Sequence, residues 1–240
     1  MKEKKYQLIA NEIKKRILNE TYKANELMPE QGKLAKEFGV SKITIKKALD
    51  GLARAGLIYK KSGLGTYVLG QTLKMGKLDS PANAFDGLYH QQGKEHIKSK
   101  VILFEPEFPS AHVAQKLNIT TTELVYNIKR LRIIDGMPFI LEHTYMPVSI
   151  VPKLPLESIK SSIYSYIHDE LNLKFGGAFR KIHSDWSNQD DVKYLETNLK
   201  VPMLEVEQVV WLANGKYVEY SKSRNVFNTR AITVVDNNNF

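Results

Sequence analysis

The sequence predicts a two-domain protein in which a small, mostly helical domain with a β-hairpin precedes a larger α+β domain with an antiparallel sheet. A chain of 240 residues is long enough for two ordinary domains. Residues 1–75 contain 16 Lys and Arg against 7 Asp and Glu, a net charge of +9, whereas residues 76–240 contain 19 basic and 19 acidic residues. Apolar residues recur at helical spacing in the basic third and alternate, as in strands, in the neutral remainder.

Composition also indicates the compartment and limits the chemistry. No stretch approaches the roughly 20 apolar residues of a membrane helix, and the charged start of the chain lacks the apolar run of a signal peptide. We therefore expect a soluble, cytoplasmic protein. The chain has no Cys, and its 6 His form no HxH or HExxH pattern, so we expect neither a metal site nor a cofactor.

The first two helices are expected from the spacing of apolar residues. The first runs to about Leu18, because apolar residues recur every three or four positions at Tyr6, Ile9, Ala10, Ile13 and Ile17. A second, shorter helix carries one apolar side and is stopped by Gly39, where a helix C-terminus favours glycine. The residues of that side are Leu34, Ala35 and Phe38.

The third expected helix has a cationic beginning. Ser41 supplies its N-cap, and the helix ends at Gly56. Its apolar stripe consists of Ile45, Ala48, Leu49 and Leu52. The residues outside that stripe in the first two turns are Lys42, Thr44, Lys46 and Lys47. Two helices joined by a Gly-Val-Ser turn, the second with exposed cationic first turns, have the geometry that places a recognition helix in the DNA major groove.

A basic hairpin is expected after this helix. Two short β-type runs, residues 57–60 and 66–69, flank a turn whose basic and small residues are Lys60, Lys61, Gly63 and Gly65. A hairpin in this position is the wing of a winged helix-turn-helix. Glycines in its turn would let backbone amides approach a phosphate or the minor groove closely.

The excess of positive charge has two readings. A basic module most often binds phosphate or an anionic membrane surface, and the alternative is a solvated lysine-rich surface. Charge alone does not separate these readings. The helix-turn-helix pattern favours DNA.

These residues resemble the winged helix-turn-helix domain of the GntR family of bacterial transcription regulators. The resemblance runs from Tyr6 to Val68 and rests on the order, spacing and glycine positions of "LMPEQGKLAKEFGVSKITIKKALDGLARAGLIYKKSGLGTYV". With the geometry above, it implies DNA contacts from Lys33, Ser41, Lys42, Thr44, Lys46, Lys47, Lys60, Lys61, Gly63, Gly65 and Thr66.

Two positions depart from the family pattern. The family usually begins its second helix with Pro-Ser-Glu-Arg, whereas this chain has Gly32 in the place of the arginine and Lys33 as the candidate to replace it. The arginine that commonly follows the turn serine is Lys42. Lysine donates from a point charge and arginine from a bidentate fork, which leaves the operator sequence open.

The rest of the chain reads as a linker and an α+β domain. Residues 70–79 contain no clear apolar period and are expected to form the linker. Beyond them, alternating segments are separated by Asp135-Gly136 and by Asn214-Gly215, both strong hairpin signals that predict an antiparallel sheet. Helical patterns occur around residues 110–117, 158–171 and 188–199.

This second part resembles the UTRA effector-binding domain, which defines the HutC subfamily of GntR regulators and has a fold similar to chorismate lyase. The resemblance covers residues 80–236 and rests on "IKRLRIIDGMPFILEHTYMP", "SSIYSYI" and "WLANGKYVEYSKSR". It implies a domain that binds a small effector. Palindromic operators and the family together imply a homodimer.

Two arginines on one expected strand need negative partners. Counting by twos places Arg130 and Arg132 on one face, roughly 7 Å apart at about 3.3 Å per residue. Their partners are either an anionic ligand or acids such as Glu142, Glu205 and Glu219. The period of the strand leaves both readings open.

The family resemblance implies an anion site. In UTRA domains that bind phosphosugars, residues at the positions of Arg130, Arg132, Ser162 and Tyr164 hold the phosphate. Glutamates at the positions of Glu142 and Glu219 take sugar hydroxyls. These residue types also suit a phosphorylated polyol chemically, because a bidentate arginine matches phosphate and a carboxylate matches neighbouring hydroxyls.

The loop before the expected strands departs from the family pattern. The family often has Ser or Thr beside a Phe there, whereas Phe85 is flanked by Ala84 and Asp86. A carboxylate at residue 86 would repel phosphate, which leaves open a different anion or an altered pose. Phe85 itself is expected to belong to the effector site.

The sequence thus predicts a transcriptional repressor that a small anionic metabolite, most simply a phosphorylated sugar, releases from its operator. One alternative is an enzyme, because the UTRA fold is similar to a lyase. However, the chain has no nucleophile elbow and no Walker loop. The other alternative is a DNA-organising protein that binds without any ligand.

Overall fold

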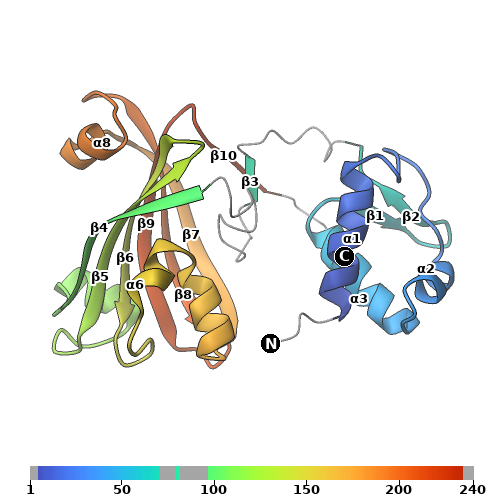
Figure 1. The fold of residues 1–240 in the computed structure, drawn as a ribbon, viewed down its shortest axis with the longest axis horizontal. Helices are drawn as coiled ribbons and strands as arrows, with labels where there is room; N and C mark the ends of the chain where they lie inside the picture. The colour runs from blue at the N-terminus through green and yellow to red at the C-terminus, as the bar shows by residue number, and fades with distance from the viewer. Residues whose placement is uncertain (1–4, 71–78, 82–96, 235–240) are drawn as a thin grey trace. The chain divides into compact units, whose positions relative to one another are not determined.

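The computed structural model describes residues 5–70, 79–81 and 97–234 of the chain (Figure 1). By its internal contacts the chain divides into two units, one of residues 1–83 together with 232–240 and the other of residues 84–231. Each unit has a hydrophobic core of its own.

The N-terminal unit contains three helices followed by a β-hairpin, as predicted. The elements are α1 (Lys5–Leu18), α2 (Gln31–Glu37), α3 (Lys42–Arg54), β1 (Ile58–Lys61) and β2 (Gly65–Val68). α3 packs against both other helices, and their apolar faces close around Ile13, Ile17, Leu34, Ile45 and Leu49. Gly39 has φ +61°, a left-handed conformation that suits glycine and turns the chain from α2 toward α3.

The second unit is built on a six-stranded antiparallel sheet in the order β4-β5-β6-β9-β8-β7, which confirms the predicted α+β class. The strands are β4 (Ile97–Glu107), β5 (Val125–Ile134), β6 (Met137–Pro147), β7 (Phe175–Trp186), β8 (Pro202–Leu212) and β9 (Tyr217–Val226). Both predicted hairpins are present. Asp135 and Gly136 have φ +50° and +84°, as a tight hairpin turn with two left-handed residues requires.

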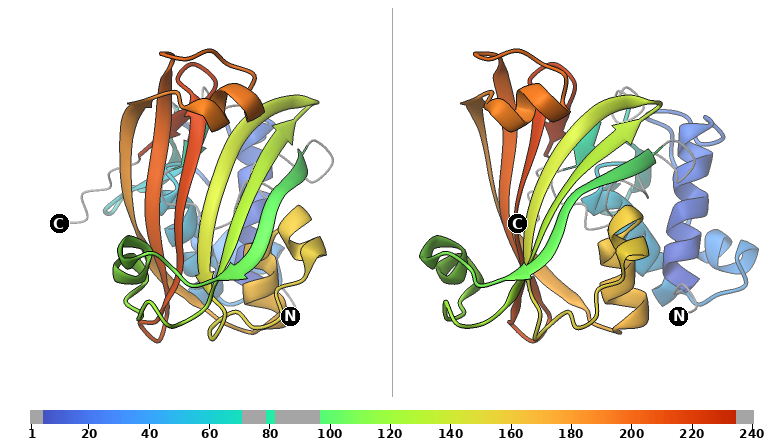
Figure 2. Two further views of the ribbon diagram at one scale, coloured as in Figure 1. Left: turned by 90° about the vertical axis from the view of Figure 1, so that its left-hand side faces the viewer. Right: turned by 60° about the vertical axis from the view of Figure 1, so that its left-hand side comes forward.

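Helices pack on both faces of this sheet (Figure 2). On one face lie α6 (Leu156–Lys160), α7 (Ile163–Ser165) and the π-helix η2 (Tyr166–Glu170). Their apolar residues join those of the strands in a core that includes Ile128, Met146, Ile159, Ile167 and Val210. On the other face lie α5 (Ala111–Leu117) and α8 (Gln189–Tyr194), near opposite ends of the strands.

Several details of the prediction were wrong or incomplete. The helix around residues 110–117 is confirmed as α5, but the helix expected over residues 158–171 is interrupted at Ser161 and Ser162. The helix expected over residues 188–199 is shorter, because α8 ends before Glu196, which has φ +53°. The two edge strands, β4 and β7, were not predicted.

A second small sheet also escaped prediction. β3 (Asp79–Pro81), at the end of the expected linker, pairs with β10 (Ala231–Thr233), near the end of the chain. The remaining linker residues, 71–78, lie outside the described residues. None of the helices described is both long and apolar enough to span a membrane.

Candidate DNA interface and effector site

The N-terminal turn of α3 is fixed by its cap. The Ser41 Oγ accepts a hydrogen bond from the backbone N–H of Thr44 at 3.3 Å, and the two hydroxyl oxygens lie 3.0 Å apart. Both predicted DNA-contact residues therefore use their hydroxyls to start the helix in the free protein. The cap orients the three helical lysines that follow, Lys42, Lys46 and Lys47, all of which are exposed.

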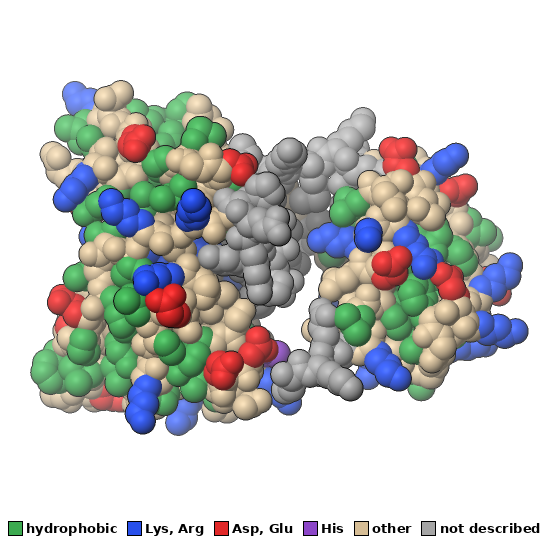
Figure 3. All heavy atoms as spheres, in the orientation of Figure 1, with side chains coloured by type: hydrophobic (Ala, Val, Ile, Leu, Met, Phe, Trp, Pro, Cys, Tyr) green, Lys and Arg blue, Asp and Glu red, His purple; other side chains and the backbone are tan. Residues whose placement is uncertain are grey.

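Lys42 occupies space that Gly32 leaves open. A Cβ added to Gly32 would lie 3.5 Å from Cε of Lys42, so the lysine stem runs over the glycine at the start of α2. Together with Lys33 and Lys36, these two residues line an open cavity between the beginnings of α2 and α3. Lys and Arg side chains project on the side of this unit that carries α2 (Figure 3).

Both lysines of the wing are exposed, and one of them is also paired. Lys61 is exposed, whereas the Nζ of Lys60 forms an ion pair with Asp50 of α3. Thr66, the last predicted contact, accepts a backbone hydrogen bond from Met28 at 2.8 Å. Gly63 has φ +73°, and apart from its chain neighbours no atom of the described residues lies within 4 Å of the position that a Cβ would take, so it is open to an approaching phosphate.

Gly65 has a structural reason to be glycine. Its φ is +112°, and a Cβ there would lie 2.7 Å from Cδ1 of Leu27. The positive φ favours glycine at this position, whatever the residue does with DNA, and a larger residue would also have to displace the end of the Leu27 side chain.

In the second unit, Arg130 and Arg132 project from β5 toward the connection between α6 and α7. Arg130 forms an ion pair with Glu142, its partner in the β5–β6 register, and donates to the carbonyl of Ile159 at 2.8 Å. Arg132 is only 2% exposed and donates to the carbonyl of Ser161 at 3.1 Å. The ion-pair reading of the two arginines therefore holds for Arg130 in the free protein.

The interruption between α6 and α7 gives the arginines these carbonyl partners. Ser162 caps α7, because its Oγ accepts from the backbone N–H of Ser165 at 3.1 Å. The break thus brings two backbone carbonyls and the capping serine to the arginine side of the sheet. A continuous helix would have used those carbonyls internally.

Tyr164 and Glu219 form the other half of the cluster, joined by Gln208 of β8. Gln208 Nε2 donates to Glu219 at 2.8 Å and to the Tyr164 hydroxyl at 3.3 Å, while Ser221 Oγ donates to Glu219 at 2.6 Å. The Gln208 Oε1 accepts from Nε of Arg180 at 2.9 Å. This chain of hydrogen bonds fixes the amide orientation of Gln208.

The two glutamates have opposite electrostatic environments. Burial raises the pKa of Glu219 above its ordinary value and outweighs the hydrogen bonds that it accepts. Burial would also raise the pKa of Glu142, but the charges of Arg130 and Arg132 and the Arg130 hydrogen bond outweigh it and lower that pKa. Glu142 is therefore held as a carboxylate, and Glu219 keeps its proton to higher pH than an ordinary glutamate.

Six of the seven predicted effector residues thus lie on one side of the sheet, and the seventh, Phe85, is outside the described residues together with Ala84 and Asp86. Sequence reasoning missed Arg180, Gln208, Ser221 and Arg230. The charge of Arg230 acts on Glu142 and on Arg180. Alternation along β8 and β9 could have placed Gln208 and Ser221, since Ser221 is two residues from Glu219 and directly opposite Gln208.

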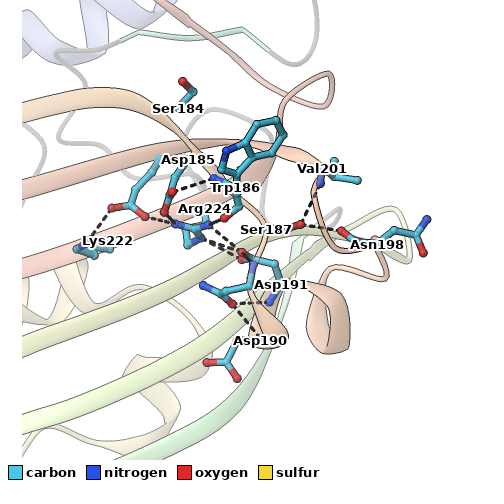
Figure 4. A network of polar contacts seen from close by, with 12 residues as sticks. Ser184, Asp185, Trp186, Ser187, Asp190, Asp191, Asn198, Val201, Lys222 and Arg224 are labelled. Carbon is cyan, nitrogen blue, oxygen red and sulfur yellow. Dashed lines mark hydrogen bonds and ion pairs between the residues drawn. The ribbon is translucent and has the colours of Figure 1, made fainter.

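A different polar network anchors α8 to the opposite face (Figure 4). Arg224 of β9 donates to the fully buried Asp191 of α8 at 2.8–3.1 Å and to Asp185 at 3.0 Å, and it also pairs with Glu205. Lys222 adds a second ion pair to Glu205 at 2.9 Å. In the parts of the chain described here, no group of acids and histidines has an arrangement that could hold a metal ion.

The fold and the two clusters define a class of protein, the DNA-binding regulators with an attached effector domain. The family model of the bacterial regulatory proteins of the gntR family matches residues 5–68, and the model of the UTRA domain matches residues 91–228. The chain belongs to the GntR family of transcriptional regulators and carries a UTRA domain.

Similar proteins cover almost the whole chain. The HTH-type transcriptional regulator GmuR of Bacillus subtilis (strain 168) is 39% identical over 97% of this chain and 98% of its own length. The mannosyl-D-glycerate transport/metabolism system repressor MngR of Escherichia coli (strain K12) is 28% identical over 93% and 91%. The crystal structure of the possible transcriptional regulator YydK of Bacillus subtilis matches with a TM-score of 0.82 and 32% identity, over 97% of this chain and 99% of that one.

Proposed function

We propose that this regulator is a homodimeric repressor that a small phosphorylated sugar releases from its operator. The observation that carries the proposal is the joining of Arg130 and Arg132 with the half-buried Glu142 and the buried Glu219 in one cluster of the UTRA domain. The proposed DNA-binding domain is residues 1–69, the linker residues 70–79 and the effector domain residues 80–236. A repressor of this kind works on the chromosome, so we place it in the cytoplasm.

The chemistry of the cluster suits an anion with hydroxyl groups. Arg132 is buried and holds its guanidinium beside the break between α6 and α7, where a phosphate would meet the capping hydroxyl of Ser162. The carboxylate of Glu142 can accept from a sugar hydroxyl. The carboxyl group of Glu219 can hydrogen-bond to another hydroxyl in either protonation state, and that combination matches a polyol better than a second anion.

The name of one relative supports the sugar chemistry. MngR is named as the repressor of a mannosyl-D-glycerate transport/metabolism system, and mannosyl-D-glycerate combines a sugar with an acidic group. From that name we propose two properties for this chain: it represses transcription, and it responds to a sugar-derived signal. The anionic group that we infer here is a phosphate, because two neighbouring arginines suit its geometry.

We infer that the protein is not an enzyme. The arginines and glutamates of the cluster hydrogen-bond with one another, with backbone carbonyls or with Gln208, which suits binding. The lyase alternative requires turnover of a bound substrate, and the DNA-organising alternative requires operator binding that no metabolite changes. A single experiment that combines operator binding with product analysis distinguishes all three.

The test is operator release by hexose 6-phosphates, hexosamine 6-phosphates and phosphorylated disaccharides. Arg132→Ala should fold and bind operator like the parent but need at least about 10-fold more effector, because a buried anion loses a charge-assisted hydrogen bond. Lys174→Ala, an exposed lysine of the same domain, is the control. A destabilised Arg132→Ala protein that releases DNA at the parent's effector concentration would contradict the anion site.

A further inference from the structure

The effector cluster consists of Arg130, Arg132, Glu142, Ser162, Tyr164 and Glu219, joined by Arg180 and Gln208. Arg230 lies at the edge of this cluster, in the segment between β9 and β10. Its Nη1 is 3.3 Å from Oδ1 of Asn225, and this fully buried asparagine donates to the carbonyl of Phe139 on β6. The next residue, Ile140, is opposite Arg132 in the β5–β6 register. Hydrogen bonds and register thus connect Arg230 to the strand that carries Glu142.

The electrostatics of Arg230 indicate the same location. Its positive charge is one of the influences that lower the pKa of Glu142, after the charges of Arg130 and Arg132. Burial and the neighbouring charge of Arg180 lower the pKa of Arg230 itself, against the attraction of Glu142. A cluster of four arginines and two glutamates has a formal excess of two positive charges, which one phosphate dianion would balance.

Arg230 is also next to the small sheet at the end of the linker. β10 begins at Ala231, directly after Arg230, and pairs with β3. By internal contacts, the residues after Ala231 belong to the N-terminal unit, whereas Arg230 belongs to the second unit. A shift of the Arg230 backbone therefore acts on a strand that is paired with the segment joining the two domains.

We propose that Arg230 is a further effector-binding residue and that β10, through its pairing with β3, transmits effector binding to the linker. The proposal rests on the proposed function. An anion in the cluster attracts the Arg230 guanidinium, and the changed position of Arg230 alters the free energy of the β3–β10 pairing. That pairing is the element with two states, formed or broken, that allosteric coupling requires.

The binding half of the proposal is tested with Arg230→Gln. The probes are glucose 6-phosphate, mannose 6-phosphate and inorganic phosphate, titrated calorimetrically into the free protein. Arg230→Gln should weaken the tightest of these by about 10-fold or more. The control is Lys216→Gln, an exposed lysine in the turn between β8 and β9. Equal affinity in Arg230→Gln and the parent would overturn this half.

The coupling half is tested with two proline variants, Ile232→Pro and Thr233→Pro. Consecutive strand residues direct their N–H groups to opposite sides, so one variant removes a β3–β10 donor and the other is its matched control. The disrupting variant should bind the probe within about two-fold of the parent, yet the ratio of operator affinities without and with probe should fall toward one. If both variants keep the parent's ratio, β10 does not transmit the signal.

Failure of the proposed function has a different signature. If neither the three probes nor any phosphorylated sugar of the operator-release panel binds the parent or changes its operator affinity, the phosphate site and this inference are both wrong. If the parent responds and the Arg230 and proline variants respond equally, only the inference is wrong.

Discussion

At the scale of single residues, the effector cluster shows how one strand face gives two arginines different roles. Arg130 is already neutralised by Glu142, whereas Arg132 holds a backbone carbonyl between two short helices. The sequence placed both on one face correctly, since alternation fixes the side of a sheet. It could not show that a helix break would supply the carbonyls, because that depends on how α6 and α7 pack.

The raised pKa of Glu219 gives a pH prediction. A carboxyl whose folded pKa exceeds its ordinary value of 4.5 contributes stability that is fully present below that value and lost as pH rises through the folded pKa. Glu219→Gln removes this loss, so its melting temperature relative to the parent should increase as the pH rises above about 4.5. Glu196→Gln, an exposed glutamate, serves as the control.

The comparison is a series of melting curves across that pH range. If the difference in melting temperature between Glu219→Gln and the parent stays constant with pH, the buried glutamate does not titrate in this range. Glu142 behaves oppositely. Its lowered pKa contributes stability above about pH 4.5 that is lost only as pH falls further.

At the scale of elements, the patterns with a strong period were predictable and the edges of the sheet were not. The four strands of the two hairpins carry alternating apolar residues and glycine turns that fix their register. β7 is an edge strand whose residues are mostly exposed, and it contains Gly176 and Gly177, so it lacks a strand period. Trp211 covers this glycine pair, since a Cβ at Gly177 would lie 2.4 Å from its ring, and that pairing is visible only in three dimensions.

For α3, we predict that Lys46→Ala weakens operator binding and reduces the slope of log affinity against log salt by about 0.9, because one phosphate contact is lost. Anisotropy titrations over a salt series measure both quantities. Lys14→Ala, an exposed lysine on α1, should leave the slope unchanged. Equal slopes for Lys46→Ala and the parent would contradict the assignment of α3 as the recognition helix.

For α8, we predict that Arg224→Met destabilises the protein by about 3–5 kcal/mol, because it leaves the fully buried Asp191 without its cation. Denaturant unfolding measures the loss. Lys222→Met removes only the outer partner of Glu205 and should cost much less. If both variants lost the same stability, the network of Figure 4 would not depend on Arg224.

At the scale of the whole molecule, the charge division of the sequence corresponds to its two functions. The basic third forms the unit with the exposed lysines of α3, and the neutral part forms the unit with the arginine and glutamate cluster. The sequence predicted this division because charge and hydrophobic period both change near residue 80. It did not predict that β10, near the end of the chain, pairs with β3 at the end of the linker, because a strand of three residues is too short to carry a hydrophobic period.

We propose that effector and operator binding are coupled through one chain, and by linkage each must then change the affinity of the other by the same factor. The most direct test measures the dissociation constant of the releasing sugar phosphate with and without saturating operator DNA, and that of the operator with and without saturating sugar phosphate. We predict two equal factors of about 5–150, in the direction of weaker binding. Dissociation constants that are identical with and without the other ligand would contradict the claim and leave a DNA-binding protein with an unrelated pocket.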